Sequence, residues 1–220
     1  LRGNPGLSGT IPSHFGTLAN IEIISLDNCP GLTGTIPTQL GALGASLKRL
    51  YIYDNPGLTG VIPSQLGALS SLEVLRLYSN PGLTGTIPTQ LGALISLEKL
   101  RLHANTELKG TLPSQLGALV SLNQLETNDI SGLTGSIPSE WAGMKSLRWL
   151  KMHNMPRLSG PCPTWFHQLT DLEELRLDNP RGTGGLTGVL PGQLPASLTE
   201  LRISGHPALR GTIPALLNVE

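Results

Sequence analysis

The sequence contains few aromatic residues, few charges and only two cysteines. Aromatic residues make up 4% of the 220 residues and charged residues 14%, and 15 Lys and Arg balance 15 Asp and Glu. A formal net charge of zero provides no global field that would draw the chain to nucleic acid or to a membrane surface. No apolar run approaches the length of a transmembrane helix, and no signal-peptide pattern opens the chain. We therefore expect no nucleic-acid partner and no membrane insertion of this segment.

Sequence patterns for catalysis and metal binding are also missing. There is no phosphate-binding loop and no group of His, Cys, Asp or Glu with metal-ligand spacing. His103 and His153 fall two repeats apart, about 10 Å at the spacing of β-strands, which is too far to share one metal ion. A hydrolytic triad needs its nucleophile, base and orienting group within one pocket. We predict no catalytic residues, no metal and no cofactor, so we do not expect an enzyme.

The two cysteines, Cys29 and Cys162, fall in slots that should point inward, five coils apart. With coils spaced by roughly 4.8 Å they lie about 24 Å apart, beyond the disulfide reach of about 7 Å. We predict free, buried thiols. The sequence has no Asn-x-Ser/Thr glycosylation signal either, so these features neither prove nor exclude secretion.

The chain does contain a strong internal repeat. The string Asn-Pro-Gly-Leu-Thr-Gly-x-Ile-Pro-x-x-Leu-Gly-x-Leu opens at Asn55 and again at Asn80. One leucine slot recurs at steps of 25 in Leu47, Leu72, Leu97, Leu122, Leu147 and Leu172. Self-similarity at such a period is typical of a solenoid. Because no linker interrupts the repeat, we predict one domain over residues 1–220, and because the chain opens inside a repeat we expect a fragment of a longer chain.

The unit L-x-x-L-x-L-x-x-N-P-G-L-T-G-x-I-P-x-x-L-G-x-L-x-S, seen in residues 72–96, is a leucine-rich repeat. Its second half, L-x-G-x-I-P-x-x-L, resembles the plant-type subclass found in receptor-kinase ectodomains and polygalacturonase-inhibiting proteins. The segment 137–147 is also similar to repeats of trypanosomatid surface antigens. The resemblance implies an extracellular or cell-surface recognition module. One regular departure is the extra residue that Asn-Pro-Gly-Leu places between Asn and Leu.

The repeat predicts a β-rich α/β solenoid of about eight coils. The segment L-x-x-L-x-L fits a short strand with inward leucines, and stacked copies form a parallel sheet on the concave face. The asparagine that follows turns the chain and bonds to backbone groups of neighbouring coils. Leu-Thr-Gly-x-Ile has strand periodicity and predicts short strands on the convex side, which the next proline ends. Gln-Leu-Gly-Ala-Leu is too short for an α-helix and favours a 3-10 turn.

Outward slots of the concave strands, followed across the coils, form vertical stripes. One stripe runs through Ser25, Tyr51, Arg76, Arg101, Glu126, Lys151, Arg176 and Arg202, so five of its eight residues are cationic. All three tyrosines fall on this face. Aromatic residues and arginine are the usual anchors of interfaces. The predicted binding residues are Tyr51, Tyr53, Arg76, Tyr78, Arg101 and His103, extended by Trp149, Lys151, Arg176 and Arg202.

We predict non-catalytic recognition of an acidic protein surface or an anionic glycan through this face. Two alternatives remain open at this point. Paired threonine rows on the convex strands, such as Thr84 and Thr86, are similar to the threonine arrays of ice-binding β-solenoids. The chain could also serve as a rigid structural subunit of a large assembly. Threonine and tyrosine suit exposed strands in any case, so composition alone does not choose between these functions.

Overall fold

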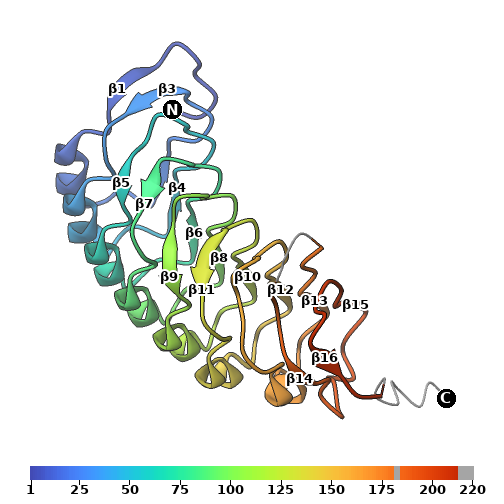
Figure 1. Cartoon of the computed structure of the whole chain (residues 1–220). Helices are drawn as coiled ribbons and strands as arrows, with labels where there is room; N and C mark the ends of the chain where they lie inside the picture. Colours follow the sequence, from blue (N-terminus) through green and yellow to red (C-terminus); the bar gives the residue numbers. More distant parts are fainter. Residues whose placement is uncertain (181–183, 213–220) are drawn as a thin grey trace.

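The computed structural model describes residues 1–180 and 184–212 of the chain. Its main feature is a parallel sheet of eight short strands, which lines the inner curve of an arc-shaped solenoid (Figure 1). The strands are β2 (Ile23–Ser25), β4 (Arg49–Tyr51), β6 (Val74–Arg76), β8 (Lys99–Arg101), β10 (Gln124–Glu126), β12 (Trp149–Lys151), β13 (Glu174–Arg176) and β15 (Glu200–Arg202). The predicted leucine-rich repeat solenoid with a parallel concave sheet is confirmed.

Register along this sheet follows the repeat. Leu50 pairs with Leu75, Leu75 with Leu100, and Leu100 with Leu125, so each inward leucine stacks on its equivalent in the next coil. All four of these leucines are fully buried. Because side chains alternate between the two faces of a strand, this register also fixes which residues line the concave surface.

A second row of short strands and a row of 3-10 helices complete most of the coils. The short strands pair as β1 (Ser8–Thr10) with β3 (Gly31–Thr33), β5 (Gly60–Val61) with β7 (Leu83–Thr84), β9 (Lys109–Thr111) with β11 (Gly132–Thr134), and β14 (Gly188–Val189) with β16 (Leu209–Arg210). The helices are η1 (Ser13–Thr17), η2 (Thr38–Leu43), η3 (Ser64–Ala68), η4 (Thr89–Ala93), η5 (Ser114–Ala118), η6 (Ser139–Gly143) and η7 (Thr164–Gln168). These helices follow the outer curve in Figure 1.

A ladder of buried asparagines joins the first coils. The Asn55 backbone N–H donates to the Asn80 side-chain oxygen at 3.1 Å, and the Asn80 N–H donates to that of Asn105 at 2.9 Å. The Asn80 amide nitrogen also donates to the carbonyls of Ile52 and Leu77, each at 2.7 Å. Each amide thus satisfies backbone groups that would otherwise be buried without a partner. Ile130 takes the same slot in the coil after Asn105 and is fully buried, so the ladder gives way to apolar packing there.

The exposed threonines of the second strand row link neighbouring coils. Thr59 Oγ1 donates to the carbonyl of Gly34 at 3.3 Å, and Thr84 Oγ1 donates to that of Gly60 at 3.2 Å. The methyl group of Thr59 lies in the other direction, against Gly82 of the next coil. Both arms of the side chain therefore make contacts along the solenoid axis, which accounts for the recurrence of threonine in this slot.

Larger residues in leucine slots fill the core as the repeat predicts. Trp141 and Phe166 are fully buried, and the indole N–H of Trp141 donates to the carbonyl of Pro113 at 2.9 Å. Phe15, in the first coil, is only partly buried. The two cysteines are free and buried, as predicted.

Candidate binding surface on the concave sheet

The sheet brings the predicted stripe residues together in the order that the repeat indicates. Arg76 pairs with Tyr51 on one side and with Arg101 on the other, and Glu126 pairs with Arg101 and Lys151. Within residues 1–180 and 184–212, no three or more His, Cys, Asp or Glu side chains are grouped so that they could hold a metal ion. The surface consists of side chains stacked in register on the parallel sheet.

Three rings form a continuous stack beside the ends of the strands. The ring centroids of Tyr53 and Tyr78 lie 4.3 Å apart with an angle of 18° between the planes. Tyr78 and His103 follow at 4.4 Å and 10°. Because the rings stack on one another along the solenoid axis, their faces are largely used within the stack. The edges and polar tips are what this row presents to a partner.

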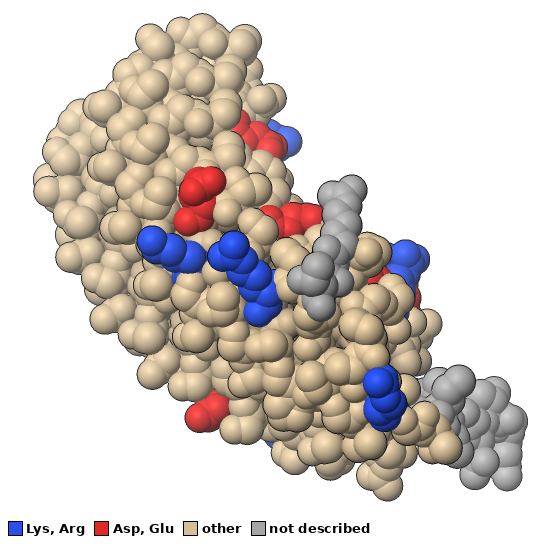
Figure 2. All heavy atoms as spheres, in the orientation of Figure 1, with Lys and Arg blue, Asp and Glu red and all other residues tan. Residues whose placement is uncertain are grey.

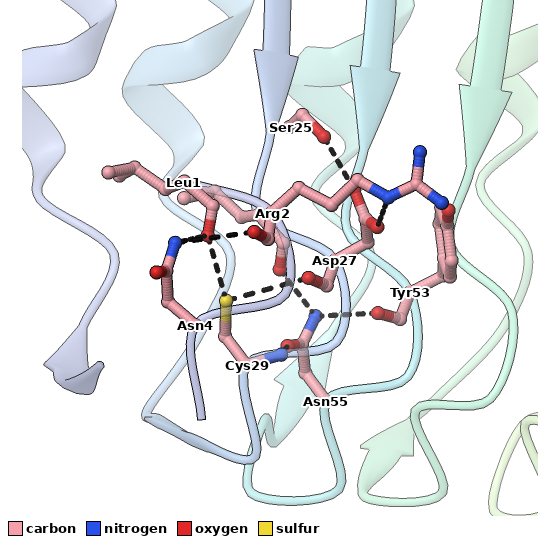
Figure 3. A network of polar contacts seen from close by, with 9 residues as sticks. Leu1, Arg2, Asn4, Ser25, Asp27, Cys29, Tyr53 and Asn55 are labelled. Carbon is pink, nitrogen blue, oxygen red and sulfur yellow. Dashed lines mark hydrogen bonds and ion pairs between the residues drawn. The ribbon is translucent and has the colours of Figure 1, made fainter. Parts of the chain in front are cut away.

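Tyr53 is more covered than the sequence pattern predicts. The pattern places it on the solvent side, but only 8% of its surface is exposed. Tyr78 covers one face, and Figure 3 shows the Arg2 side chain reaching across Asp27 toward the Tyr53 ring. Arg2 Nε lies 3.0 Å from the buried Asp27 carboxylate, and Ser25 donates to the same carboxylate. The segment before the first strand thus contacts Asp27, an interaction that repeat periodicity cannot reveal.

Arg76 is held on an aromatic face and lacks a carboxylate partner among the described residues. Its guanidinium carbon lies 5.0 Å from the centroid of the Tyr51 ring, within the range of a cation–π contact. The Arg76 Nε atom is buried and has no hydrogen-bond partner in the described part of the chain. A cation that is positioned but not neutralised is suited to receive an acidic group.

Arg101, the next cation in the stripe, lies beside a buried carboxylate. Arg101 Nε is 3.6 Å and His103 Nδ1 is 3.2 Å from Glu126 Oε2, and Gln124 donates to Glu126 Oε1 at 2.7 Å. Burial alone would raise the pKa of Glu126. The nearby His103 and Arg101, with the hydrogen bond from Gln124, outweigh burial and lower that pKa to about 2. Glu126 is therefore ionised at neutral pH and offsets the charge of Arg101.

The remaining cations of the stripe belong to a chain of ion pairs. Lys151 Nζ lies 3.2 Å from Glu174, and Arg176 contacts both Glu174 and Glu200. Arg202 Nε lies 2.6 Å from Glu200. These glutamates occupy the neighbouring stripe. The positive charge that the sequence pattern suggests along strands β12, β13 and β15 is therefore largely neutralised. The glutamates are the residues that sequence reasoning missed, although their slots in the repeat were visible.

Trp149, the remaining predicted aromatic residue of this face, lies beside a cation. Trp149 is partly exposed, and the Arg148 guanidinium carbon lies 4.8 Å from its ring centroid. Burial raises the pKa of the Tyr78 phenol. The neighbouring Tyr53 and Asp54 raise this pKa further, whereas Arg76 lowers it. The Tyr78 phenol therefore keeps its proton and can donate a hydrogen bond.

Away from the sheet, burial raises the pKa of the Cys162 thiol to about 11, which leaves the thiol unreactive at neutral pH.

Comparison with protein families assigns the chain. A model described as a leucine-rich repeat region matches residues 6–184. The chain belongs to the leucine-rich repeat family, and its structural likenesses place it in the plant-type group. No curated protein sequence matches the chain.

Solved structures of plant receptors share this architecture. The plant peptide hormone receptor RGFR1, in complex with RGF2, is 31% identical with a TM-score of 0.81, and the match covers 89% of this chain and 30% of that one. The Arabidopsis receptor kinase HAESA, in complex with the peptide hormone IDA and the co-receptor SERK1, is 33% identical with a TM-score of 0.75, covering 98% and 38%. The chain thus spans less than two fifths of the length of either receptor.

A plant ice-binding protein is also similar in fold, with a TM-score of 0.61 over 98% of this chain and 83% of that one. Its sequence identity is 22%, so the likeness concerns the fold alone. No described helix of this chain is long and apolar enough to cross a membrane.

Proposed function

We propose that this domain is a non-catalytic recognition module that binds a protein or an extended peptide on its concave sheet, at the cell surface or outside the cell. The observation that carries the proposal is Arg76, held on the Tyr51 ring and without a carboxylate partner among the described residues. The likeness to plant receptor ectodomains that hold peptide hormones supports the same class of partner.

The centre of the proposed surface is narrower than the full stripe. Tyr51, Arg76, Tyr78 and His103 present an unneutralised cation and a row of polar tips. Arg101, Lys151, Arg176 and Arg202 have glutamate partners, so we place them at the margin. A rim charge that is already paired contributes little to affinity, whereas a desolvated anchor contributes much.

A peptide suits this surface better than a glycan. Sugar rings pack on exposed aromatic faces, but here the faces of Tyr53 and Tyr78 are stacked together and the Tyr51 face carries Arg76. Phenol and imidazole tips spaced along the axis instead favour the carbonyls and acidic side chains of a chain that crosses several coils. We therefore do not extend the proposal to an anionic glycan.

The test is selection of a displayed random-peptide library on the immobilised domain. We expect enriched peptides to contain Asp or Glu and to lose binding to an Arg76→Gln domain. Arg202→Gln is the matched control, because it removes the same charge from the same stripe at a position already paired with Glu200. Equal loss in both variants, or equal binding by both, would place recognition elsewhere.

The ice-binding alternative has its own test. The exposed threonine rows are its only support, and the hydroxyls of Thr59 and Thr84 already donate to glycine carbonyls. Thermal hysteresis that disappears when Thr86 is replaced by a bulky residue would support ice binding. Absence of hysteresis, together with peptide capture that depends on Arg76, would support the concave module. A structural subunit would show neither property and would bind its assembly through other faces.

A further inference from the structure

A second feature of the chain lies away from the concave sheet, in the turns that connect it to the second strand row. Thr106, Glu107, Lys109, Ser131 and Arg157 line an open groove of about 440 Å³ over three consecutive coils. All five depart from the residue that the repeat places at their slots. Figure 2 shows two Lys or Arg side chains next to one another on this face, with acidic atoms beside them.

Two of these departures add hydrogen-bond donors. The slot before the repeat glycine holds proline in Pro30, Pro56 and Pro81, but Thr106 and Ser131 in the next two coils. Proline has no backbone N–H, so each change supplies both an N–H and a hydroxyl. The turns close by bonds from Leu108 to Asn105 and from Leu133 to Ile130, which leave the N–H groups of Thr106 and Ser131 without a backbone partner among the described residues.

Two further departures add cations. Lys109 stands where Thr59 and Thr84 occur in earlier coils, and Arg157 stands in the glycine slot of the repeat. Both side chains are exposed, and neither forms an ion pair with any described residue. Glu107 is the one acidic departure, and it too forms no ion pair within the described chain.

Glu107 and Arg157 occupy a slot of the repeat in which close packing against the preceding coil favours glycine. A Cβ atom added to Gly57 or Gly82 would lie 2.4 Å from the carbonyl oxygen of the preceding coil, and one added to Gly132 would lie 2.2 Å from that of Leu108. Side chains at the same slot in Glu107 and Arg157 therefore require the backbone to shift. Residues placed against the local packing rule are expected at functional positions rather than at structural ones.

The groove has a small floor between charged walls. Gly132 pairs with Lys109 in the ladder of β9 and β11, and with Ser131 it carries little side-chain volume. Lys109 lies one coil before this floor and Arg157 one coil after it, so the walls are about 10 Å apart at the strand spacing. That width admits one small anionic group between the two cations.

We propose that this groove binds a tetrahedral oxyanion, a sulfate or phosphate group, through Lys109, Arg157 and the N–H and hydroxyl groups of Thr106 and Ser131. Donors approach from three coils, and an anion with four oxygens can accept from all three directions. A carboxylate has two oxygens in one plane and would leave part of the donor set unused. This site is independent of the proposed recognition by the concave sheet.

The experiment is a titration of the ¹⁵N-labelled domain with sodium sulfate, sodium phosphate and sodium acetate at constant ionic strength, followed by amide chemical shifts. We expect saturable shifts of Thr106, Ser131 and Gly132 for at least one tetrahedral anion, with a dissociation constant on the order of millimolar. Acetate should bind about tenfold more weakly or not at all. The relative response to sulfate and phosphate identifies which group the site prefers.

Variants that restore the chain's own repeat make the test specific. The double change Thr106→Pro and Ser131→Pro removes donors without changing charge, and we expect affinity to fall about fivefold or more. Lys109→Thr with Arg157→Gly should abolish saturable shifts, while Glu107→Gln should strengthen binding. Arg49→Gln removes one concave cation and should leave affinity within about twofold. Equal affinity in the restored variants, equal binding of acetate, or no saturable shift in the parent would overturn the proposal.

Discussion

Arg76 and Arg101 lie directly opposite each other on β6 and β8, and within the described residues only Arg101 of the two forms an ion pair with a carboxylate. Like charges opposite each other on neighbouring strands repel. The repulsion is relieved on one side by Glu126, at 3.6 Å from Arg101, and on the other by the Tyr51 ring beneath Arg76. This asymmetry leaves one cation of the pair available to a partner.

Glu126 should contribute stability that depends on pH. Its pKa is about 2 in the folded protein, below the ordinary value of 4.5, so its contribution is fully present above about pH 4.5 and is lost as the pH falls toward 2. The side chain is 10% exposed, and lowering the pKa from 4.5 to about 2 corresponds to a loss on the order of 3 kcal/mol. Glu126→Gln removes this group, so urea unfolding of both proteins between pH 6 and pH 2.5 should show a shallower decline for the variant. Parallel declines would contradict this assignment.

Free and paired cations of the same stripe should respond differently to substitution. We expect Arg76→Gln to change the free energy of unfolding by less than about 1 kcal/mol, because it loses a cation–π contact but also a like-charge neighbour. Arg176→Gln should cost about 1–2 kcal/mol, because it leaves Glu174 and Glu200 without their shared partner. Denaturant unfolding at neutral pH measures both. A larger loss for Arg76→Gln would show that Arg76 has a structural partner.

The asparagine ladder should be sensitive to a single truncation. Asn80→Ala leaves the carbonyl of Ile52 and the N–H of Asn55 without their side-chain partner, whereas the carbonyl of Leu77 keeps its hydrogen bond from Asn105. At about 1 kcal/mol or more for each of these two buried groups, we expect a loss of about 2 kcal/mol. Asn20→Ala is the control, because Asn20 is exposed and should change stability by less than about 0.5 kcal/mol. Equal stability of the two variants in thermal unfolding would show that the asparagine ladder does not stabilise the fold.

The glycine after the leucine of helices η2 to η5 should resist even a methyl group. A Cβ atom on Gly67 would lie 2.4 Å from the carbonyl oxygen of Gln90 in the next coil. We expect Gly67→Ala to cost about 1–3 kcal/mol by forcing the two coils apart. A Cβ atom on Gly6 would meet nothing within 4 Å, so Gly6→Ala should be close to neutral. Calorimetric unfolding of the two variants compares the same chemical change with and without a close neighbour, and equal effects would contradict the packing argument.

The sequence predicted most of the fold because each coil repeats the same physical solution. Leucines at fixed spacing require an inward face, and stacking of identical strands requires a parallel sheet in register. The same periodicity placed Tyr51, Arg76 and Arg101 on one stripe of the concave face. It also indicated that Cys29 and Cys162 would be free and buried.

The candidate site could be predicted only in outline. Its stripes follow from the repeat, but Tyr53 is 8% exposed where the pattern placed it on the surface, and the ring of Tyr78 stacks on one of its faces. The pairing of Arg202 with Glu200 depends on two flexible side chains finding each other across stripes. A slot assignment states which face a side chain occupies and does not state which neighbour it contacts.

The sequence by itself thus determined the solenoid, its register and the residues on each face, since these depend on backbone periodicity and on burial of apolar side chains. Tertiary structure decided which charges remain open. Glu126, Glu174 and Glu200 neutralise most of the cationic stripe, and Arg76 lies on Tyr51 without such a partner in the part of the chain that the structure describes. Tertiary structure also gathered Thr106, Lys109, Ser131 and Arg157, which come from three coils, around one groove. The physical reason is that charge pairing and groove formation depend on distances of a few ångströms between side chains of different coils, which no single repeat contains.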